Sequence, residues 1–270
     1  MRAALAASLA LTLALSACGG GKQAPEAAAS PTPAPRKPCE AALFEDVHLT
    51  LCVADPASDT IRTALAPKDG KPWRSLAAYA ASRPANAQPV AFAINGGTFD
   101  DDGMPVGYYV EDHQRLHELN RNPGPGNFHL LPNGVFFGTG DSWQIRTSKD
   151  FFDHVTSRPD FGTQSGPMLV IGGELHPKII PEGGSLRIRD AVGIDSAGRA
   201  VFVISDDPIS LGQLARFYRD VLKVKNALYL DGTVSSLWVP ETGRLDNSYP
   251  LGPLIVVEKK AKAPTKEAAP

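Results

Sequence analysis

The stretch that decides the fold reads Asn226-Ala227-Leu228-Tyr229-Leu230-Asp231-Gly232-Thr233-Val234-Ser235-Ser236. Its apolar part, residues 227–230, is typical of a buried strand, and Asp231-Gly232 ends that strand abruptly. A strand that ends in a carboxylate and a glycine can present a reactive acid to a cleft. The alternative is a strand followed by an ordinary Asp-Gly turn, which is a common arrangement. The segment alone does not distinguish a reactive acid from an ordinary turn, so the rest of the sequence is needed.

Short apolar runs bounded by turn residues recur along the chain and predict a protein rich in strands. They lie at residues 47–53, 61–65, 90–94, 107–110, 134–137, 142–146, 168–171, 191–194, 200–204, 227–230 and 254–257. Only residues 75–82 and 209–222 have helical periodicity, the second with Ser210 as a candidate N-cap. No strand–helix–strand rhythm repeats. The sequence therefore predicts an α+β protein, a single domain with a large mixed or antiparallel sheet and few helices.

The N-terminal residues predict export and membrane anchoring. Met1-Arg2 precedes an apolar run of about a dozen residues, which fits a secretory signal and is too short to span a bilayer as a helix. Leu15-Ser16-Ala17-Cys18 resembles a bacterial lipobox, which implies cleavage of residues 1–17 and lipidation of Cys18. The alternative is an ordinary signal peptide cut near Ala17. Gly19 follows Cys18, and resemblance to Gram-negative sorting signals implies a cell-envelope lipoprotein of the outer membrane, facing the periplasm.

Composition divides the rest of the chain into three parts. Residues 18–38 are rich in Ala and Pro and read as a tether, because they cannot bury enough apolar surface to fold. Residues 39–258 are enough for one large domain, and residues 259–270 predict a disordered tail. The net charge of −2, with mixed signs and no basic stripe, argues against nucleic acid as a partner. Nothing in the sequence predicts the oligomeric state.

Two further cysteines predict a disulfide. Cys39 and Cys52 flank Phe44-Glu45-Asp46, a candidate turn between two strands, and an oxidising compartment favours their pairing. The alternative is two buried reduced thiols. No Cys/His cluster has zinc spacing, and Asp100-Asp101-Asp102-Gly103 lacks the glutamate that a calcium loop requires. We therefore predict neither a metal nor a cofactor.

Polar clusters occur where apolar strands end, at Asn95-Gly96-Gly97, Ser165-Gly166-Pro167, Arg187-Ile188-Arg189-Asp190, and Asp231-Gly232 with Ser235 and Ser236. Each alone is compatible with a turn, a loop bend or a surface charge. Together they supply glycines that let backbone amides approach an anion, an arginine that can grip phosphate and a carboxylate that can act as acid, base or nucleophile. The set fits a phosphodiester site. No Gly-x-Ser-x-Gly elbow, Walker loop or His-Glu-x-x-His motif occurs.

One of these clusters carries a family resemblance. Asn95-Gly96-Gly97-Thr98-Phe99-Asp100 resembles the Asn-x-Gly-x-Phe opening of the phosphodiester glycosidase family, and the chain is similar above all to its short bacterial branch. Four more stretches are similar to that branch: residues 105–111, residues 126–128 with 132–136, residues 163–169 and residues 227–236. The resemblance covers residues 40–257, the whole predicted domain, and implies the fold of that family.

The resemblance also implies a reaction, the hydrolysis of a sugar-1-phosphodiester such as an N-acetylglucosamine-1-phosphodiester. The catalytic residues that it implies are Asp231, Arg189 and Asn95, and the implied substrate-binding residues are Gly96, Gly97, Gln164, Ser165, Gly166, Gly232, Ser235 and Glu111. The sequence departs from the branch at two positions. Asp190 stands where the branch usually has Asn, and His113 stands where it usually has Gly.

The expected mechanism centres on Asp231, which would face the anomeric carbon as nucleophile or as base for water. Arg189 and backbone amides near Gly96 and Gly166 would stabilise charge on the phosphate. A second carboxylate is normal in glycoside hydrolysis, and Glu111 and Asp190 are both candidates. Two competing hypotheses are a non-catalytic envelope lipoprotein that binds glycans or anionic polymers, and a structural tether. In a tether, Asn95, Arg189 and Asp231 would be dispersed.

Overall fold

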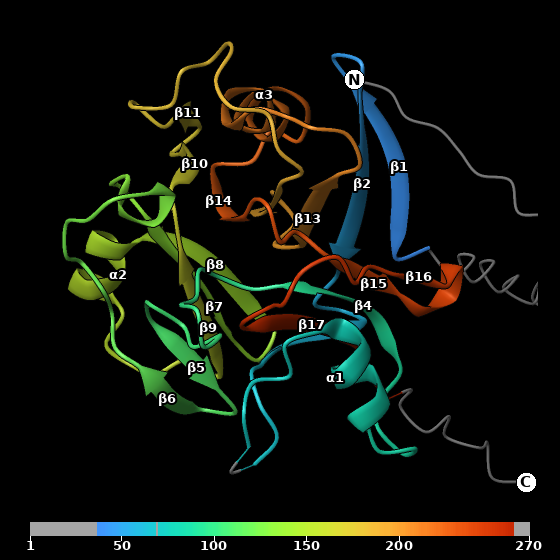
Figure 1. Ribbon diagram of the computed structural model, residues 1–270. Coiled ribbons are helices and arrows are strands. Elements are labelled where there is room, and N and C mark those ends of the chain that lie inside the picture. The colour runs from blue at the N-terminus through green and yellow to red at the C-terminus, as the bar shows by residue number, and fades with distance from the viewer. Residues whose placement is uncertain (1–36, 69, 262–270) are drawn as a thin grey trace, which may run out of the picture. The chain divides into compact units, whose positions relative to one another are not determined.

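The strands form three sheets in which all neighbouring strands are antiparallel (Figure 1). The computed structural model describes residues 37–68 and 70–261. The predicted signal peptide, Cys18 and nearly all of the predicted tether lie outside these residues, as do residues 262–270. No helix in the described ranges is both long enough and apolar enough to cross a bilayer.

The largest sheet, sheet 1, has seven strands. Its spatial order is β1 (Cys39–Phe44), β2 (Val47–Ala54), β13 (Ala200–Ser205), β12 (Asp190–Ile194), β14 (Asn226–Asp231), β10 (Met168–Ile171) and β11 (Glu174–Leu175). The order shows that β2 pairs with a strand about 150 residues further along the chain. The predicted strand of residues 227–230 lies within β14, near the centre of this sheet.

Sheets 2 and 3 have five strands each. Sheet 2 runs in the order β16 (Arg244–Leu245), β15 (Leu237–Val239), β4 (Val90–Asn95), β17 (Leu254–Lys259) and β3 (Asp59–Ala64). Sheet 3 runs in the order β6 (Gln114–His117), β5 (Tyr109–Glu111), β9 (Phe161–Ser165), β7 (Gly134–Thr139) and β8 (Ser142–Thr147). Together with sheet 1, these sheets surround a shared apolar core.

Aromatic rings from all three sheets meet in that core. The Phe202 ring of sheet 1 lies 5.4 Å from the Phe92 ring of sheet 2 and 5.8 Å from the Phe136 ring of sheet 3, between ring centroids. Phe136 in turn contacts Phe161, also at an edge-to-face angle. Pairs in this geometry contribute about 0.5–1.5 kcal/mol each beyond the burial of their area. The contacts therefore fix how the three sheets meet, and the strand ends around the core with them.

The described residues contain three short α-helices, each packed on the outer face of one sheet. Helix α1 (Leu76–Ser82) covers sheet 2, α2 (Ser148–His154) covers sheet 3 and α3 (Leu211–Arg216) covers sheet 1. Ser210 caps α3 in a capping box with Gln213, as its side-chain type predicts. The remaining helical turns are η1 (Asn127–His129), the π-helical η2 (Phe217–Val221) and η3 (Pro240–Thr242).

The predicted disulfide is confirmed. Cys39 and Cys52 stand directly opposite each other on β1 and β2, and their sulfur atoms are bonded at 2.02 Å. The two strands are joined by Glu45 and Asp46, which both have positive φ values, 47° and 62°. Two such residues are typical of the tight turn that matches the twist of a hairpin.

The α+β prediction with few helices is confirmed, but the strands of the described residues form three antiparallel sheets and not one large sheet. The other differences are local. Helix α2 was not predicted, and the expected helix over residues 209–222 is α3 followed by the π-helical turn η2. The predicted tail begins too early, because β17 continues through Lys259. The Lys260 ammonium also donates to the Pro56 carbonyl, at 2.5 Å, and pairs with Asp141 at 2.6 Å.

Candidate active site

The candidate site lies where strands of all three sheets end. Asn95 is the last residue of β4 in sheet 2, Ser165 is the last residue of β9 in sheet 3, and Asp231 is the last residue of β14 in sheet 1. Asp190, the first residue of β12, is the direct cross-strand partner of Asp231. Four strands distant in sequence thus deliver polar side chains to one place, as the strand-end clusters in the sequence predicted.

One oxygen of Asp190 joins this cluster. Asp190 Oδ1 accepts hydrogen bonds from Asn95 Nδ2 at 3.1 Å, from the Asp231 amide at 3.0 Å and from Ser235 Oγ at 3.0 Å. Asn95 completes the link, because its own Oδ1 accepts the Ser236 amide at 2.8 Å. Asp190 is fully buried, so it holds the backbone at Asp231 and the loop after it without facing solvent.

The two aspartates differ in exposure and in proton affinity. Burial, reinforced by the nearby charge of Asp231, raises the pKa of Asp190 well above its usual range. Its second oxygen, Oδ2, is buried and has no hydrogen-bond partner among the described residues, so a proton on Asp190 would reside there. Asp231 is half-buried, and burial raises its pKa to about 6 against the opposing effects of the Gly232 amide and Arg189. At neutral pH, Asp231 is therefore the ionised member of the pair.

Arg189 supplies the positive charge next to this pair, and its guanidinium is held almost entirely by the protein. Nε donates to the Ile209 carbonyl at 2.8 Å, Nη1 to the Tyr229 hydroxyl at 2.9 Å, and Nη2 to the carbonyl and hydroxyl of Ser185 at 2.9 and 3.0 Å. The residue is only 2% exposed. Its Nη1 group keeps one N–H for a ligand, so Arg189 acts mainly through a fixed charge.

Gly232 lies against the Tyr229 hydroxyl that holds Arg189. A Cβ at position 232 would overlap that hydroxyl, with Arg189 Nη1 next nearest. The Gly232 amide also donates to Asp231 Oδ1 at 2.5 Å and so orients the carboxylate. Packing therefore requires a glycine at position 232, and the hydrogen bond uses the carboxylate of Asp231. An ordinary exposed turn would have neither constraint.

An irregularity in the β12–β14 ladder opens a place for Ser165. The register shifts between Asp190 and Ala191, which leaves Leu230 without a cross-strand partner on β12. The Leu230 carbonyl instead accepts Ser165 Oγ at 2.7 Å, and the Thr98 hydroxyl lies 3.2 Å from the same Ser165 oxygen. Bulges are frequent beside active sites because they re-aim neighbouring side chains. Here the bulge ties sheet 3 to the end of β14.

The glycines after Asn95 serve close packing. The Gly96 amide donates to the Pro253 carbonyl at 2.6 Å and the Gly97 amide to Thr163 Oγ1 at 3.0 Å, so both are satisfied within the protein. A Cβ on Gly97 would overlap the backbone of Gln164, and one on Gly166 would overlap Asn133 and the Phe128 carbonyl. These positions let three chain segments approach one another at the site.

Comparison with known proteins shows the family of the chain. A sequence profile described as phosphodiester glycosidase matches residues 88–260, which include Asn95, Arg189 and Asp231. The Escherichia coli (strain K12) protein named "Uncharacterized protein YigE" is 34% identical over 212 residues, covering 76% of this chain and 80% of that protein. The chain belongs to the phosphodiester glycosidase family. The resemblance noted in the sequence is confirmed.

Solved structures of other proteins share the fold of this phosphodiester glycosidase family member. The catalytic domain of zebrafish N-acetylglucosamine-1-phosphodiester alpha-N-acetylglucosaminidase, auto-inhibited by its pro-peptide, superposes with a TM-score of 0.57. It is 16% identical, and the match covers 82% of each chain. A hypothetical protein from Synechocystis matches with a TM-score of 0.50 at 16% identity, over 82% of this chain and 61% of that one. At these identities the likeness concerns the fold.

Two of the predicted substrate-binding residues lie apart from the cluster. Gln164 directs its side chain to the Tyr108 and Asn120 amides, the Asn120 carbonyl and the Ser148 hydroxyl, which use all its main hydrogen-bonding capacity. Glu111 accepts the Leu65 amide and the Tyr109 hydroxyl and lines a separate pocket with Arg62. Between the two candidate second carboxylates, the structure therefore places Asp190, and not Glu111, beside Asp231.

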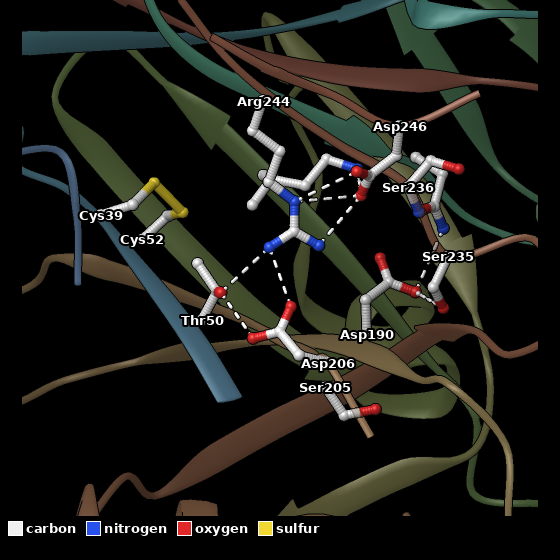
Figure 2. Close-up of polar contacts among 12 residues, drawn as sticks. Cys39, Thr50, Cys52, Asp190, Ser205, Asp206, Ser235, Ser236, Arg244 and Asp246 are labelled. Atoms are coloured by element: carbon white, nitrogen blue, oxygen red, sulfur yellow. Dashed lines mark hydrogen bonds and ion pairs between the residues drawn. A yellow bond between two sulfur atoms is a disulfide. The ribbon is translucent and has the colours of Figure 1, made fainter. Parts of the chain in front are cut away.

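An arginine network that the sequence did not suggest lies beside the site (Figure 2). Arg244 Nη1 donates to Asp206 at 2.8 Å and to Thr50 Oγ1 at 3.0 Å, and Nη2 pairs with Asp246 at 3.0 Å. Asp246 also accepts the Leu237 amide at 3.0 Å, which holds the strand that follows Ser235 and Ser236. The network therefore links sheet 1 to the strand that leaves the candidate site.

The groups that hold Arg189 were also missed by the sequence analysis. Tyr229, Ser185 and Ile209 come from three different segments, and only Tyr229 had a usable signal. It stands two residues before Asp231 in a strand, a spacing that places alternate side chains on one face. Across the described residues, no three His, Cys, Asp or Glu side chains cluster as metal ligands would.

Proposed function

We propose that this phosphodiester glycosidase family member is an extracytoplasmic hydrolase that releases the sugar from a sugar-1-phosphodiester in envelope or extracellular glycans. The observation that carries the proposal is the half-buried Asp231 carboxylate. It is oriented by the Gly232 amide and flanked by the fixed charge of Arg189. The zebrafish relative in fold is named for an N-acetylglucosamine-1-phosphodiester substrate, which supports this substrate class.

In this proposal, Asp231 faces the anomeric carbon as nucleophile or as base for water. Asp190 is a positioning residue, because it is fully buried and holds Asp231, Asn95 and Ser235 through one oxygen. A phosphate ester is a good leaving group, so the reaction needs charge stabilisation more than an acid. The fixed charge of Arg189 would stabilise negative charge that develops at the reacting centre, at no cost of reorganisation.

The cellular location is part of the same proposal. We infer an envelope protein anchored by lipid at Cys18, in the outer membrane and facing the periplasm. The Leu15-Ser16-Ala17-Cys18 segment supports this inference. The Cys39–Cys52 disulfide is also consistent with an oxidising compartment. Labelling with a palmitate analogue, compared between the wild type and Cys18→Ser, tests the anchor. Equal labelling of the two would contradict it.

The function is tested by offering the purified protein a panel of sugar-1-phosphodiesters, including teichoic-like and capsule-like polymers. Release of free sugar from one member of the panel, lost in Asp231→Asn, is the expected result. Saturable binding of a glycan without any release of sugar would contradict hydrolysis and support the non-catalytic binding protein instead.

A further inference from the structure

A second polar pocket lies away from the candidate active site, on the outer face of sheet 3. It has a volume of about 460 Å³ and is lined by Arg115, Glu118, Arg121, Arg158 and the aromatic residues Tyr108 and Phe152, among others. This volume lies in the range of small-molecule binding pockets, which is about 300–1,000 Å³. Tyr108 belongs to the apolar cluster on the outer face of sheet 3. The candidate active site lies instead at the strand ends where the three sheets meet.

The positive charges of this pocket are incompletely neutralised. Of its three arginines, Arg115 pairs with Glu118 at 2.9 Å. Among residues 37–68 and 70–261, no carboxylate lies within ion-pair distance of Arg121 or Arg158. Asp153, which senses the charge of Arg121, is itself paired with Lys149. Like charges gathered in one pocket repel each other, and a bound anion would relieve that repulsion.

The contacts of the two unpaired guanidinium groups leave most of their donors free. The Arg121 guanidinium carbon lies 3.7 Å from the centre of the Phe152 ring, a stacking contact that leaves the N–H groups at its edge available. Arg158 Nη1 makes a long hydrogen bond to the His113 carbonyl, 3.4 Å. Arg115 and Arg158 both act on the Tyr108 hydroxyl, where their charges oppose the rise in pKa that burial causes.

From this arrangement we infer that the pocket of Arg115, Arg121 and Arg158 is a binding site for the phosphate group of a phosphorylated ligand. Arginine forks, of which that of Arg121 is stacked on Phe152, match the planar, multiple-acceptor geometry of phosphate oxygens, and the Tyr108 hydroxyl adds a neutral donor. The site is separate from the catalytic cluster and does not depend on the proposed hydrolysis. Its ligand is either a terminal phosphate monoester or an internal phosphodiester of an anionic polymer, which share the recognised oxygens.

The test is a titration of the full-length protein with inorganic phosphate and with dimethyl phosphate at constant ionic strength, followed by amide chemical shifts and by calorimetry. The test variant is Arg121→Gln/Arg158→Gln. The control variant is Lys71→Gln/Arg219→Gln, which changes the net charge equally at surface positions outside the pocket. We expect at least about tenfold weaker binding in the test variant, since two charge-assisted contacts are lost, and unchanged binding in the control.

The shifted amides are expected in residues 113–121 and 155–158. Tighter binding of inorganic phosphate would assign the pocket to a terminal monoester, and tighter binding of dimethyl phosphate to an internal diester. Equal affinity in the test variant and the wild type would overturn the inference. So would displacement of phosphate by chloride at equal concentration, or shifts confined to residues around Asp231.

Discussion

Asp231 combines partial exposure with a pKa raised to about 6, and this predicts a pH dependence of activity. A nucleophile or base must be ionised, so kcat/KM should fall as the pH drops below about 6 and level off above it. The measurement is a pH–rate profile on the substrate found by the panel. A profile flat between pH 5 and 7.5 would show that another group carries the reaction.

The same raised pKa predicts an opposite trend in stability. Between the usual pKa of an aspartate and about 6, the folded protein binds a proton at Asp231 that the unfolded chain does not. The contribution of Asp231 to the free energy of unfolding should therefore rise by about 1–3 kcal/mol as the pH falls from 7 to 4.5. Urea unfolding of wild type and Asp231→Asn at both pH values isolates this contribution. Identical pH dependence in the two proteins would contradict it.

At this scale, the sequence predicted the residue types of the site better than their roles. Asp231 and Asn95 each end an apolar strand, but that local signal also fits an ordinary turn, and the prediction needed the other strand-end clusters and the family resemblance. Arg189 was predicted to grip phosphate, yet Tyr229, Ser185 and Ile209 occupy all of its N–H donors except one on Nη1. Strand alternation places Tyr229 on the same face as Asp231, but it does not show that Tyr229 meets Arg189. The two residues are 40 positions apart and come together through the pairing of β12 with β14.

Strand β14 and the turn after it form the element that links Asp231 to Arg189, and Gly232→Ala tests that link. The new methyl group would overlap the Tyr229 hydroxyl. We expect a loss of about 1–3 kcal/mol in the free energy of unfolding, as in other overpacked sites. A fall in kcat of at least about tenfold should accompany it, because the carboxylate and the guanidinium are both displaced.

The control for this prediction is the double variant Gly232→Ala/Tyr229→Phe. Removing the hydroxyl makes room for the methyl group, so chemical denaturation should show part of the lost stability restored. Activity should stay low, because a phenyl ring without the hydroxyl cannot accept the Arg189 hydrogen bond. Equal stability of wild type and Gly232→Ala would mean that the Tyr229 contact does not constrain the turn.

The elements themselves were predictable where one physical signal dominated. β10, β12 and β13 were found because apolar residues bounded by glycine, proline or polar turns are typical of buried strands. Helix α2 was missed because Ser148–His154 is only seven residues long and carries just two adjacent aromatics, too few to establish a helical period. The π-helical turn after α3 leaves the side-chain spacing nearly helical, so sequence periodicity does not distinguish it.

In the whole molecule, Arg244 joins two sheets beside the site, and its replacement tests how far that junction supports the fold. Arg244→Met removes the ion pairs to Asp206 and Asp246 while keeping most of the side-chain volume. We expect the free energy of unfolding, measured with urea, to fall by about 1–3 kcal/mol. The reason is that the Arg244 side chain is only 27% exposed and that both carboxylates lose their partner. Arg219→Met, which pairs only with its exposed neighbour Asp220, serves as control and should change stability little. Equal effects of the two substitutions would contradict a structural role for the network.

The disulfide at the edge of sheet 1 should also contribute to the stability of the whole fold. Cys39→Ser/Cys52→Ser removes the disulfide between residues separated by 13 positions. We expect the free energy of unfolding to fall by about 2–4 kcal/mol. Thermal unfolding with and without a reducing agent should show the same difference in the wild type. An unchanged midpoint in both experiments would show that strand pairing alone fixes the hairpin.

The whole-molecule arrangement was the least predictable level. The sequence indicated many strands and one large sheet, whereas the described residues form three sheets around the shared Phe92, Phe136 and Phe202 core. Pairings such as β2 with β13 join segments far apart in the chain, and alternation of apolar residues does not specify which strands pair. The family resemblance implied a shared fold but did not give these pairings.

Asp231 is the residue that we propose performs the hydrolysis of a sugar-1-phosphodiester. The most direct measurement compares the rate of sugar release by wild type and Asp231→Asn on the same substrate, with circular dichroism confirming that both are folded. Asparagine is nearly isosteric but carries no charge. The rate should therefore fall by about 10³-fold or more while the fold is kept. Near-normal release by a folded Asp231→Asn protein would contradict the account.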